Sequence, residues 1–386
     1  MKALHTADLH LGKVFYEQSL IEDQAHFLGQ LTALLADRDY ALLVIAGDVY
    51  DRSIPSPEAV ELFSAFLGNL LAQRRDLEII IIPGNHDSSA RLGFGQELFS
   101  RLGIHLVTHW EDAFRPVTIR GTAVFCLPFF SQTDFRSSSK DVPLPERLEE
   151  ARRAAVAQGA RSTMLVSHSF MQGGVESESE RIFLGTAERL NPEAFMGFDY
   201  LALGHLHRFQ PVGRNGWYSG SPLAYSFSEG SYEKVVLSVE IGSDRPEVRP
   251  IPVRPLRNLR KLTGPFDYFF SNATDPLLKA AQEDYLEIVL TDSALVENPL
   301  PILRRRFPRL LAIDQRTAFL TAFGAGRVDS AAPQQAGGIL DARVDGQILG
   351  TDFDEFLLDV YGSADPEKSR LFLELLSECS REERDA

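Results

Sequence analysis

The stretch from Glu78 to Asp87, which reads EIIIIPGNHD, decides the fold of this 386-residue chain. Its four consecutive isoleucines are β-branched and stop at Pro83-Gly84, a pattern typical of a buried strand that ends in a turn. The chain thereby delivers Asn85, His86 and Asp87 to the carboxyl end of a core strand. In an open α/β sheet, ligands bind at that edge. The pattern predicts that this tetrapeptide supplies both a metal ligand and a proton-handling histidine.

Four other short apolar segments also end in polar clusters. Helical patterns over Ile21 to Ala36 and around Val60 to Leu70 separate the first three strands. The clusters contain only Asp, Asn and His as candidate ligands. The segments and their ends are Lys2 to Thr6 before Ala7-Asp8-Leu9-His10, Ala41 to Ala46 before Gly47-Asp48-Val49-Tyr50-Asp51, Thr163 to Val166 before Ser167-His168-Ser169, and Tyr200 to Leu203 before Gly204-His205-Leu206-His207.

If these strand ends lie side by side, they form a set of oxygen and imidazole ligands without a thiolate. Such a set suits Mn²⁺ or Fe²⁺ as readily as Zn²⁺, and it is too large for one ion. We therefore expect a two-metal centre in which Asp48 is the natural bridge, and such centres act on phosphate esters. The candidate metal ligands are Asp8, His10, Asp48, Asn85, His168, His205 and His207.

Three further residues of these clusters receive predicted roles beside the metals. His86 follows a ligand, so it should point over the site and either stabilise developing charge or protonate the leaving oxygen. Asp87 is the candidate to orient its ring. For Asp51, a helix-initiating or hydrogen-bonding role and a role near the substrate are equally good interpretations. The remaining histidines, His5, His26, His105 and His109, fit no such pattern and are expected to be structural.

Composition indicates an ordinary globular protein, with 44% apolar and 24% charged residues. Because a strand-like segment follows Met1 directly and no long apolar run occurs, we expect no signal peptide, no membrane span and a cytoplasmic location. Cys126 and Cys379 form no Cys-x-x-Cys pair, which argues against a disulfide framework or a zinc ribbon. The net charge of −15 weakens a nucleic-acid interpretation, but Asp341 to Ala386 alone carries 13 acids against 5 bases.

The last third of the chain predicts additional parts. A strand over Lys234 to Ile241 closes the first domain, and the Pro-rich run Arg249 to Pro255 is interpreted as a linker. A small α+β domain is predicted from a strand over Tyr285 to Leu290, a helix over Pro299 to Arg306 and a strand over Leu310 to Asp314. The predicted boundaries are residues 1–250 for the first domain, 256–323 for the small domain, 324–340 for a flexible linker and 341–386 for a terminal helix pair.

The terminal helices carry two apolar stripes at helical spacing. These stripes either dock on a partner protein or pack on the small domain. Their residues are Phe353, Phe356, Leu357 and Val360 on the first helix and Phe372, Leu375 and Leu376 on the second.

Taken together, the five polar clusters resemble those of the calcineurin-like metallophosphoesterases. The flanking residues Leu4 to Gly12, Asp48 to Pro57 and Asp199 to Phe227 resemble, more narrowly, the bacterial SbcD family of double-strand-break-repair nucleases. The resemblance implies a two-sheet α/β/β/α sandwich with a small DNA-capping domain. It also implies that one metal is held by Asp8, His10, Asp48 and His207, that the other is held by Asp48, Asn85, His168 and His205, and that His86 is catalytic.

The same resemblance implies an activity and partners. The activity is Mn²⁺-dependent exonuclease action on duplex DNA ends and endonuclease action on single strands or hairpins, with Mg²⁺ or Fe²⁺ as alternative ions, during repair at the nucleoid. The partners are a second copy of the chain and a coiled-coil ATPase of the SbcC type, on which the terminal helices would dock. Arg304 to Arg306 either contact DNA phosphate or form a solvated helix face. At the position of Asp51, some relatives carry a His that assists exonuclease action.

Two other functions remain open from the sequence. The same scaffold could serve a phosphatase or a cyclic-nucleotide phosphodiesterase, although a small substrate would not need the appended domain and helices. A non-catalytic interaction subunit is the third hypothesis. Every ligand type is present in the five clusters, which argues against the third.

Overall fold

The structure is a computed structural model of the full chain, and it describes residues 1–36, 39–130, 142–177, 189–242, 245–272, 274–315 and 370. Its contacts divide the chain into two units, Met1–Gly324 and Ala325–Ala386. The predicted flexible linker and the seven docking residues predicted on the terminal helices lie outside the described residues.

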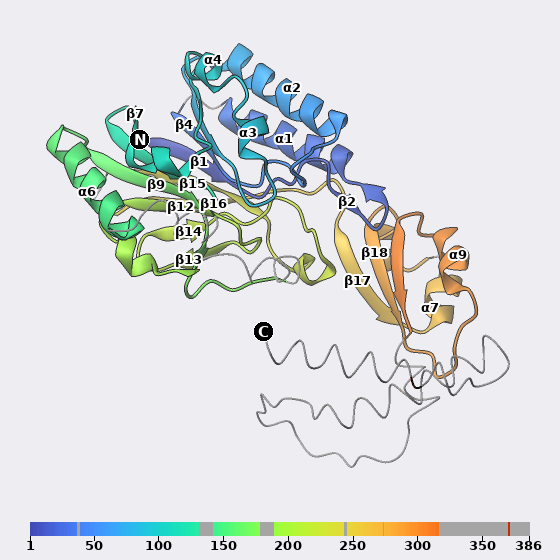
Figure 1. Ribbon diagram of the computed structural model, residues 1–386. Coiled ribbons are helices and arrows are strands. Elements are labelled where there is room, and N and C mark those ends of the chain that lie inside the picture. The colour runs from blue at the N-terminus through green and yellow to red at the C-terminus, as the bar shows by residue number, and fades with distance from the viewer. Residues whose placement is uncertain are drawn as a thin grey trace. The chain divides into compact units, whose positions relative to one another are not determined.

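Two six-stranded sheets form the main body of the first unit (Figure 1). The first has the order β16-β15-β1-β4-β5-β6 and consists of β16 Glu247–Pro252, β15 Val235–Glu240, β1 Lys2–Thr6, β4 Leu42–Ala46, β5 Glu78–Ile82 and β6 Ile104–Leu106. The second has the order β13-β14-β12-β9-β8-β7 and consists of β13 Gln210–Val212, β14 Gly216–Tyr218, β12 Tyr200–Gly204, β9 Ser162–His168, β8 Thr122–Leu127 and β7 Val117–Ile119.

Helices and short elements connect these strands. The helices are α1 Ile21–Leu35, α2 Pro57–Gln73, α3 Ser89–Leu92, α4 Gln96–Ser100 and α6 Leu144–Ala157. The short elements are the strands β2 Val14–Phe15, β3 Gln18–Ser19, β10 Phe170–Met171 and β11 Arg189–Leu190, and the 3₁₀ helices η1 Trp110–Phe114, η3 Pro192–Phe195 and η4 Phe227–Glu229. Local chemistry accounts for the start of α2, where the Ser56 side chain caps the helix by accepting from the Ala59 N–H and Pro57 follows at the first helical position.

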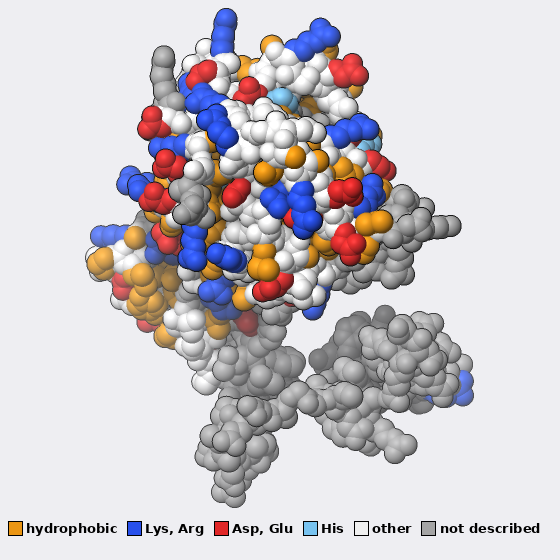
Figure 2. Space-filling view, turned by 90° about the vertical axis from the view of Figure 1, so that its left-hand side faces the viewer, with side chains coloured by type: hydrophobic (Ala, Val, Ile, Leu, Met, Phe, Trp, Pro, Cys, Tyr) orange, Lys and Arg blue, Asp and Glu red, His pale blue; other side chains and the backbone are white. Residues whose placement is uncertain are grey.

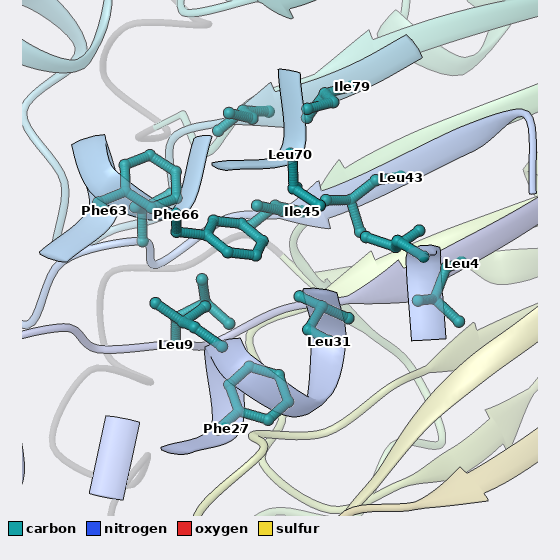
Figure 3. Close-up of a cluster of buried hydrophobic side chains, with 14 of the residues drawn as sticks. Leu4, Leu9, Phe27, Leu31, Leu43, Ile45, Phe63, Phe66, Leu70 and Ile79 are labelled. Atoms are coloured by element: carbon teal, nitrogen blue, oxygen red, sulfur yellow. The ribbon is translucent and has the colours of Figure 1, made fainter. Parts of the chain in front are cut away.

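Three apolar layers hold the main body together. One lies between the first sheet and helices α1 and α2, where Phe27 and Phe66 pack against strand residues such as Ile45 (Figure 3). A second lies between the second sheet and α6, and a third fills the space between the two sheets. The layers are therefore helix, sheet, sheet, helix, which confirms the predicted α/β/β/α sandwich.

Strand direction brings the predicted ligand motifs to one edge. Strands β1, β4 and β5 run parallel in the first sheet, and β9 and β12 run parallel in the second. The carboxyl ends of parallel strands meet at the same edge of a sheet, so their following loops converge. Beyond the strands the pairing continues, because the backbone N–H groups of Asp8 and His10 donate to the carbonyls of Gly47 and Asp48 at 3.0 Å each.

The predicted linker at Arg249 to Pro255 is wrong for most of its length. Residues Glu247–Pro252 form β16, which pairs antiparallel with β15 at the edge of the first sheet. The Val253 N–H donates to the Lys234 carbonyl, just before β15, at 2.8 Å. Every second residue of β16 faces β15 in this way, and Pro250 and Pro252 are the residues in between. Their nitrogens point away from the sheet, so no hydrogen bond is lost. Proline is compatible with an edge strand on that side.

The small domain, which we call the cap, is a three-stranded parallel sheet with three short helices. Its strands are β17 Leu259–Gly264, β18 Tyr285–Leu290 and β19 Leu310–Asp314, and its helices are α7 Phe266–Ser271, α8 Pro276–Ala280 and α9 Pro299–Arg304. It has an apolar core of its own around Phe269, Ile288 and Phe307. The sequence patterns predict β18, β19 and α9, whereas β17 is not foreseen. Among the described residues, the helices are too short or too polar to cross a membrane.

Candidate metal centre

The strand ends bring all seven predicted metal ligands into one cluster, and all of them except Asn85 are buried. Four of these residues adopt a left-handed backbone conformation, with φ of 54° at Asp8, 44° at His10, 48° at Asp48 and 105° at His205. Side chains other than glycine rarely adopt such angles, and the strain persists where the surrounding structure enforces it, most often at functional sites. The backbone is therefore bent sharply after β1, β4 and β12, where the ligand side chains turn inward.

Glycines beside the ligands make this convergence possible. A Cβ atom on Gly84 would lie 2.1 Å from the Asp48 Oδ1 atom, and one on Gly47 would lie 2.1 Å from the His168 Nδ1 atom. No real Cβ atom approaches other atoms this closely. These motifs therefore need glycine because a ligand from another strand occupies the space of its side chain.

The first ligand set contains Asp8, His10, Asp48 and His207. The His10 Nε2 atom lies 3.1 Å from the His207 Nε2 atom and 3.6 Å from the Asp48 Oδ2 atom. Potential ligand atoms of Asp8, His10 and His207 all lie within 4.8 Å of one another. Asp8 also accepts the His205 backbone N–H at 3.0 Å, which ties this set to the motif of the other.

The second set contains Asp48, Asn85, His168 and His205. The Asn85 Oδ1 atom lies 3.0 Å from both the His168 Nε2 atom and the His205 Nδ1 atom. The Asp48 Oδ2 atom lies 3.6 Å from His168 Nε2, the same distance as from His10 Nε2 in the first set. Asp48 is thus placed between the two sets, where a bridging carboxylate would lie.

The protonation pattern of these side chains fits bound cations. The His168 Nδ1 atom lies 2.9 Å from the Ala46 carbonyl, so it must be the protonated nitrogen, and Nε2 keeps its lone pair. That lone pair faces the Asn85 oxygen, which is also an acceptor. Two acceptors in contact at a partly buried site are unfavourable unless both bind a cation. In addition, His205 Nε2 and His10 Nδ1 are buried without a hydrogen-bond partner among the described residues.

Burial also keeps the imidazoles neutral, which is the form that binds metals. Burial lowers the pKa of His205 to about 3, and it lowers the pKa of His10 well below the usual value. For His10, the neighbouring His207 and His86 rings add to the effect. Burial lowers the pKa of His168 as well, against the opposing charge of Asp48. Neutral nitrogens and carboxylates without a thiolate suit Mn²⁺, Fe²⁺ or Zn²⁺.

His86 lies beside the ligands and is held by the backbone of Asp51. Its Nδ1 atom lies 2.8 Å from the Asp51 carbonyl, and its Nε2 atom lies 4.0 Å from the Asp48 Oδ2 atom. The ring meets the His10 ring edge-on, with centroids 4.7 Å apart. The Asp51 carboxylate accepts from Lys13 Nζ at 2.8 Å and lies 3.6 Å from the His10 Nδ1 atom, so it makes hydrogen-bonding contacts beside the first ligand set. Its role near the substrate stays a prediction.

The prediction that Asp87 orients the His86 ring requires correction, because the Asp51 carbonyl holds that nitrogen. The Asp87 carboxylate instead accepts three backbone N–H groups, those of Val49, Tyr50 and Gly84, at 2.9 Å each. Burial and the neighbouring Asp48 raise the pKa of Asp87 to about 7, and the three N–H donors act in the opposite direction. Asp87 thus clamps the loop after β4 to the loop after β5.

Two residues at the centre were missed from the sequence. The Glu229 carboxylate lies 3.2 Å from the His207 Nδ1 atom, and the Tyr225 hydroxyl donates to the Leu9 carbonyl beside His10. Both lie just around the end of the stretch Asp199 to Phe227 that carried the family resemblance. Their roles depend on a long-range contact, and the only local signal is an acid and a Tyr in a Ser-rich turn.

Comparisons with known proteins identify the family of the chain. The family model of the calcineurin-like phosphoesterases matches residues 1–209. The chain is 32% identical over 324 residues to the SbcD subunit of the nuclease SbcCD from Staphylococcus saprophyticus, covering 82% of this chain and 85% of the relative. It is 33% identical over 325 residues to the protein of the same name in Staphylococcus epidermidis, covering 81% and 85%.

Among solved structures, a dimetal phosphatase from Danio rerio aligns with 66% of this chain and 99% of its own, at 10% identity and a TM-score of 0.42. The family model spans more than half of the chain, and the staphylococcal proteins exceed 30% identity over most of their length. The chain therefore belongs to the calcineurin-like phosphoesterases and, within them, to the SbcD family of SbcCD nuclease subunits.

Proposed function

We propose that this chain is the nuclease subunit of a DNA end-processing complex and that it hydrolyses phosphodiester bonds with two divalent cations. The observation that carries the proposal is the pair of ligand sets that share Asp48. Bound there, two cations would polarise the phosphate and lower the pKa of an attacking water to about 7. Asp8, His10, Asp48 and His207 would hold one, and Asp48, Asn85, His168 and His205 the other.

The protein's own part in the reaction falls mainly to His86. Its Nδ1 is fixed by the Asp51 carbonyl, so the other nitrogen faces the site and can hold a proton near the departing oxygen. Asp87 acts indirectly, because its three N–H contacts fix the loops that carry Asp48 and Asn85. This arrangement would position a proton donor at the edge of a ligand cluster whose other imidazoles are buried.

DNA as the substrate rests on the named relatives and on the appended cap. We propose exonuclease action on duplex ends and endonuclease action on single strands and hairpins, with Mn²⁺ as the ion. Of the three adjacent arginines, Arg304 and Arg306 donate to backbone carbonyls within the cap, at 2.8 Å and 2.7 Å. A DNA contact from this group would therefore fall to Arg305, which is exposed.

One face of the molecule supports localised rather than broad contact with phosphate. On the face drawn in Figure 2, basic and acidic side chains are interspersed. Such a face offers no continuous positive surface to a phosphate backbone. DNA affinity would then draw on the metal centre, where bound cations would reverse the local sign of the carboxylates.

A homodimer and an ATPase partner of the SbcC type complete the proposal. An apolar groove of about 520 Å³ lies between α2 and the α3–α4 segment, and beside it Phe94 and Leu98 are 82% and 68% exposed. We propose this surface for contact with the second copy, since large exposed apolar patches commonly mark interfaces. The terminal helices, with Phe353 and Phe372, would dock on the partner.

A phosphatase or cyclic-nucleotide phosphodiesterase on the same scaffold is the competing function. Purified protein should be incubated with Mn²⁺ and end-labelled linear duplex and hairpin DNA, with p-nitrophenyl phosphate as the small substrate. The nuclease proposal expects cleavage of both DNAs and little release of p-nitrophenol. Rapid hydrolysis of the small ester with both DNAs left intact would establish the competitor instead.

A further inference from the structure

The side chain of Glu229 stands out among buried groups that the proposed reaction does not use. It is fully buried at the end of η4, and its Oε1 atom lies 3.2 Å from the Nδ1 atom of His207. Because a carboxylate can only accept, His207 must carry its proton on Nδ1. The Nε2 lone pair of His207 is thereby directed at the His10 Nε2 atom, inside the first ligand set.

A buried ion pair balances this carboxylate. Lys234, which is 8% exposed, donates to the Glu229 Oε2 atom at 2.7 Å and to the Ser221 hydroxyl at 2.8 Å. Ser226 and the Tyr225 backbone N–H add contacts to Glu229 at 3.2 Å and 3.3 Å. A charge pair of this kind is costly to bury and adds little stability compared with apolar residues of similar volume. Its geometry therefore points to a function beyond packing.

One histidine of each ligand set is anchored by a group outside that set, and the two anchors differ. His168 of the second set donates from Nδ1 to the neutral carbonyl of Ala46, whereas His207 of the first set faces a carboxylate. A carboxylate partner fixes the ring more firmly and makes the opposite nitrogen a stronger base than a carbonyl does. The anchor of His168 is the Ala46 backbone carbonyl, whereas the anchor of His207 is the Glu229 side chain, which a substitution can remove.

We propose that Glu229, balanced by Lys234, is a positioning residue that strengthens metal binding selectively in the first ligand set. This rests on the proposed two-metal function and concerns the ligand His207 alone. It predicts an asymmetric centre, in which loss of the Glu229 charge loosens one cation and leaves the other in place. A purely structural role would instead weaken both sites together with the fold.

The test measures Mn²⁺ binding to the full chain by isothermal titration calorimetry. Glu229→Gln keeps the shape but removes the charge, and Glu229→Gln/Lys234→Met also removes the buried cation that would otherwise lose its partner. Both are expected to bind one Mn²⁺ about 10–100-fold more weakly, with the second affinity unchanged. Glu78→Gln is the matched control, because Glu78 pairs with His105 at 2.8 Å in a partly exposed position outside the ligand sets, and it should not alter either affinity.

Thermal melting of each apoprotein shows whether the fold is kept. If the double variant bound two Mn²⁺ with wild-type affinities, or if both affinities fell together with the melting temperature, the positioning role would be overturned. Failure of the wild-type protein to bind two Mn²⁺ would count against the two-metal function itself. The two failures are therefore distinguishable in one set of titrations.

Discussion

At the scale of single residues, Asp48 connects the parts of the centre. Its Oδ2 atom is equidistant, at 3.6 Å, from one histidine of each ligand set, and its Oδ1 atom accepts the His86 backbone N–H at 2.9 Å. The residue adopts a left-handed conformation, which costs about 1–3 kcal/mol for a side chain of this kind. Its position thus joins the two proposed ligand sets and His86, and the surrounding sheets offset the strain.

Replacing His86 with Ala separates proton handling from metal binding. The ring is absent from both proposed ligand sets, so Mn²⁺ should bind with nearly unchanged stoichiometry and affinity. Cleavage of duplex DNA should fall by about 10²–10⁴-fold, the usual contribution of a general acid or base. Calorimetry with Mn²⁺ and a single-turnover cleavage assay measure the two effects. His105→Ala removes a histidine paired with Glu78 outside the ligand sets and serves as the control. Normal cleavage by the His86 variant would show that the role is misassigned.

His5 makes the protein sensitive to acid by a separate route. Its ring is fully buried beside the Tyr200 hydroxyl, and burial lowers its pKa to about 3 from the usual 6.5. The unfolded chain therefore binds this proton first, so the stability contributed by neutral His5 is complete above pH 6.5 and is lost as pH falls toward 3.

We expect the His5→Asn variant to lose less stability in acid than the wild type. At pH 5, protonation of His5 in the unfolded chain costs the wild type about 2 kcal/mol, since each pH unit below 6.5 contributes about 1.4 kcal/mol. Denaturant unfolding at pH 7.5 and pH 5.0, with a chelator present, measures the difference for each protein. Equal acid losses in the two proteins would contradict this origin.

At the scale of elements, the strand ends bring the ligands together because the backbone after one strand lies directly against a ligand side chain from another strand. In Gly84→Ala the new Cβ atom would lie 2.1 Å from the Asp48 carboxylate. Either Asp48 or the loop after β5 must move, so Mn²⁺ binding should weaken by at least tenfold, together with a lower melting temperature. Gly29→Ala is the control, because nothing lies within 4 Å of that position in α1, and it should stabilise the helix by about 0.5–1 kcal/mol. Wild-type Mn²⁺ affinity in Gly84→Ala would refute the steric account.

The strands and their ligand clusters were predictable because both signals are local. Four isoleucines followed by Pro-Gly specify β5 and its end without reference to any other part of the chain. The edge strand β16 was not predictable, because its prolines are typical of a linker. Only the pairing with β15 shows that their nitrogens point away from the sheet. The parts played by the Asp51 carbonyl, Asp87 and Glu229 were missed or misassigned for a related reason: each depends on which backbone or side-chain atom a distant segment presents.

At the scale of the whole molecule, the charge is divided unevenly along the chain. Residues from Asp341 onward carry 13 acids and 5 bases, a net of −8, so the remaining 340 residues carry −7 of the total −15. The part that holds the metal centre is thus only mildly acidic for its length, which is compatible with binding a polyanion at a site that cations neutralise.

Truncation after Gly338 tests the division of labour along the chain. The proposed metal centre and cap lie entirely before this point, so Mn²⁺-dependent cleavage should be retained within about threefold, because domain boundaries in linkers tolerate truncation. Binding to the ATPase partner, measured by co-purification, should be abolished. The full-length variant Phe353→Asp/Phe372→Asp is the companion, since it removes the proposed docking surface without deletion. Retained binding by both proteins would exclude the terminal helices as the docking site.

A buried polar contact through Asp23 of α1 helps to join the cap to the main body. Asp23 is 3% exposed and accepts from Arg257 Nη1 and from the Tyr285 hydroxyl of β18, at 2.9 Å each. Asp23→Asn keeps the size but removes the charge from a buried pair, so the contact should weaken by about 1–3 kcal/mol.

If the cap positions DNA over the metals, the Asp23→Asn variant should cleave duplex DNA several-fold more slowly. It should hydrolyse the small diester bis(p-nitrophenyl) phosphate at the wild-type rate, because that substrate needs only the metal centre. Glu22→Gln, which removes the exposed neighbouring contact to Arg257, is the control and should change neither rate. Hydrogen exchange should become faster in β17 and β18 of the Asp23 variant, where docking protects the strands. An equal fall in both rates would instead indicate damage to the metal centre, because α1 also packs against the first sheet. That result would contradict a separate role of the cap.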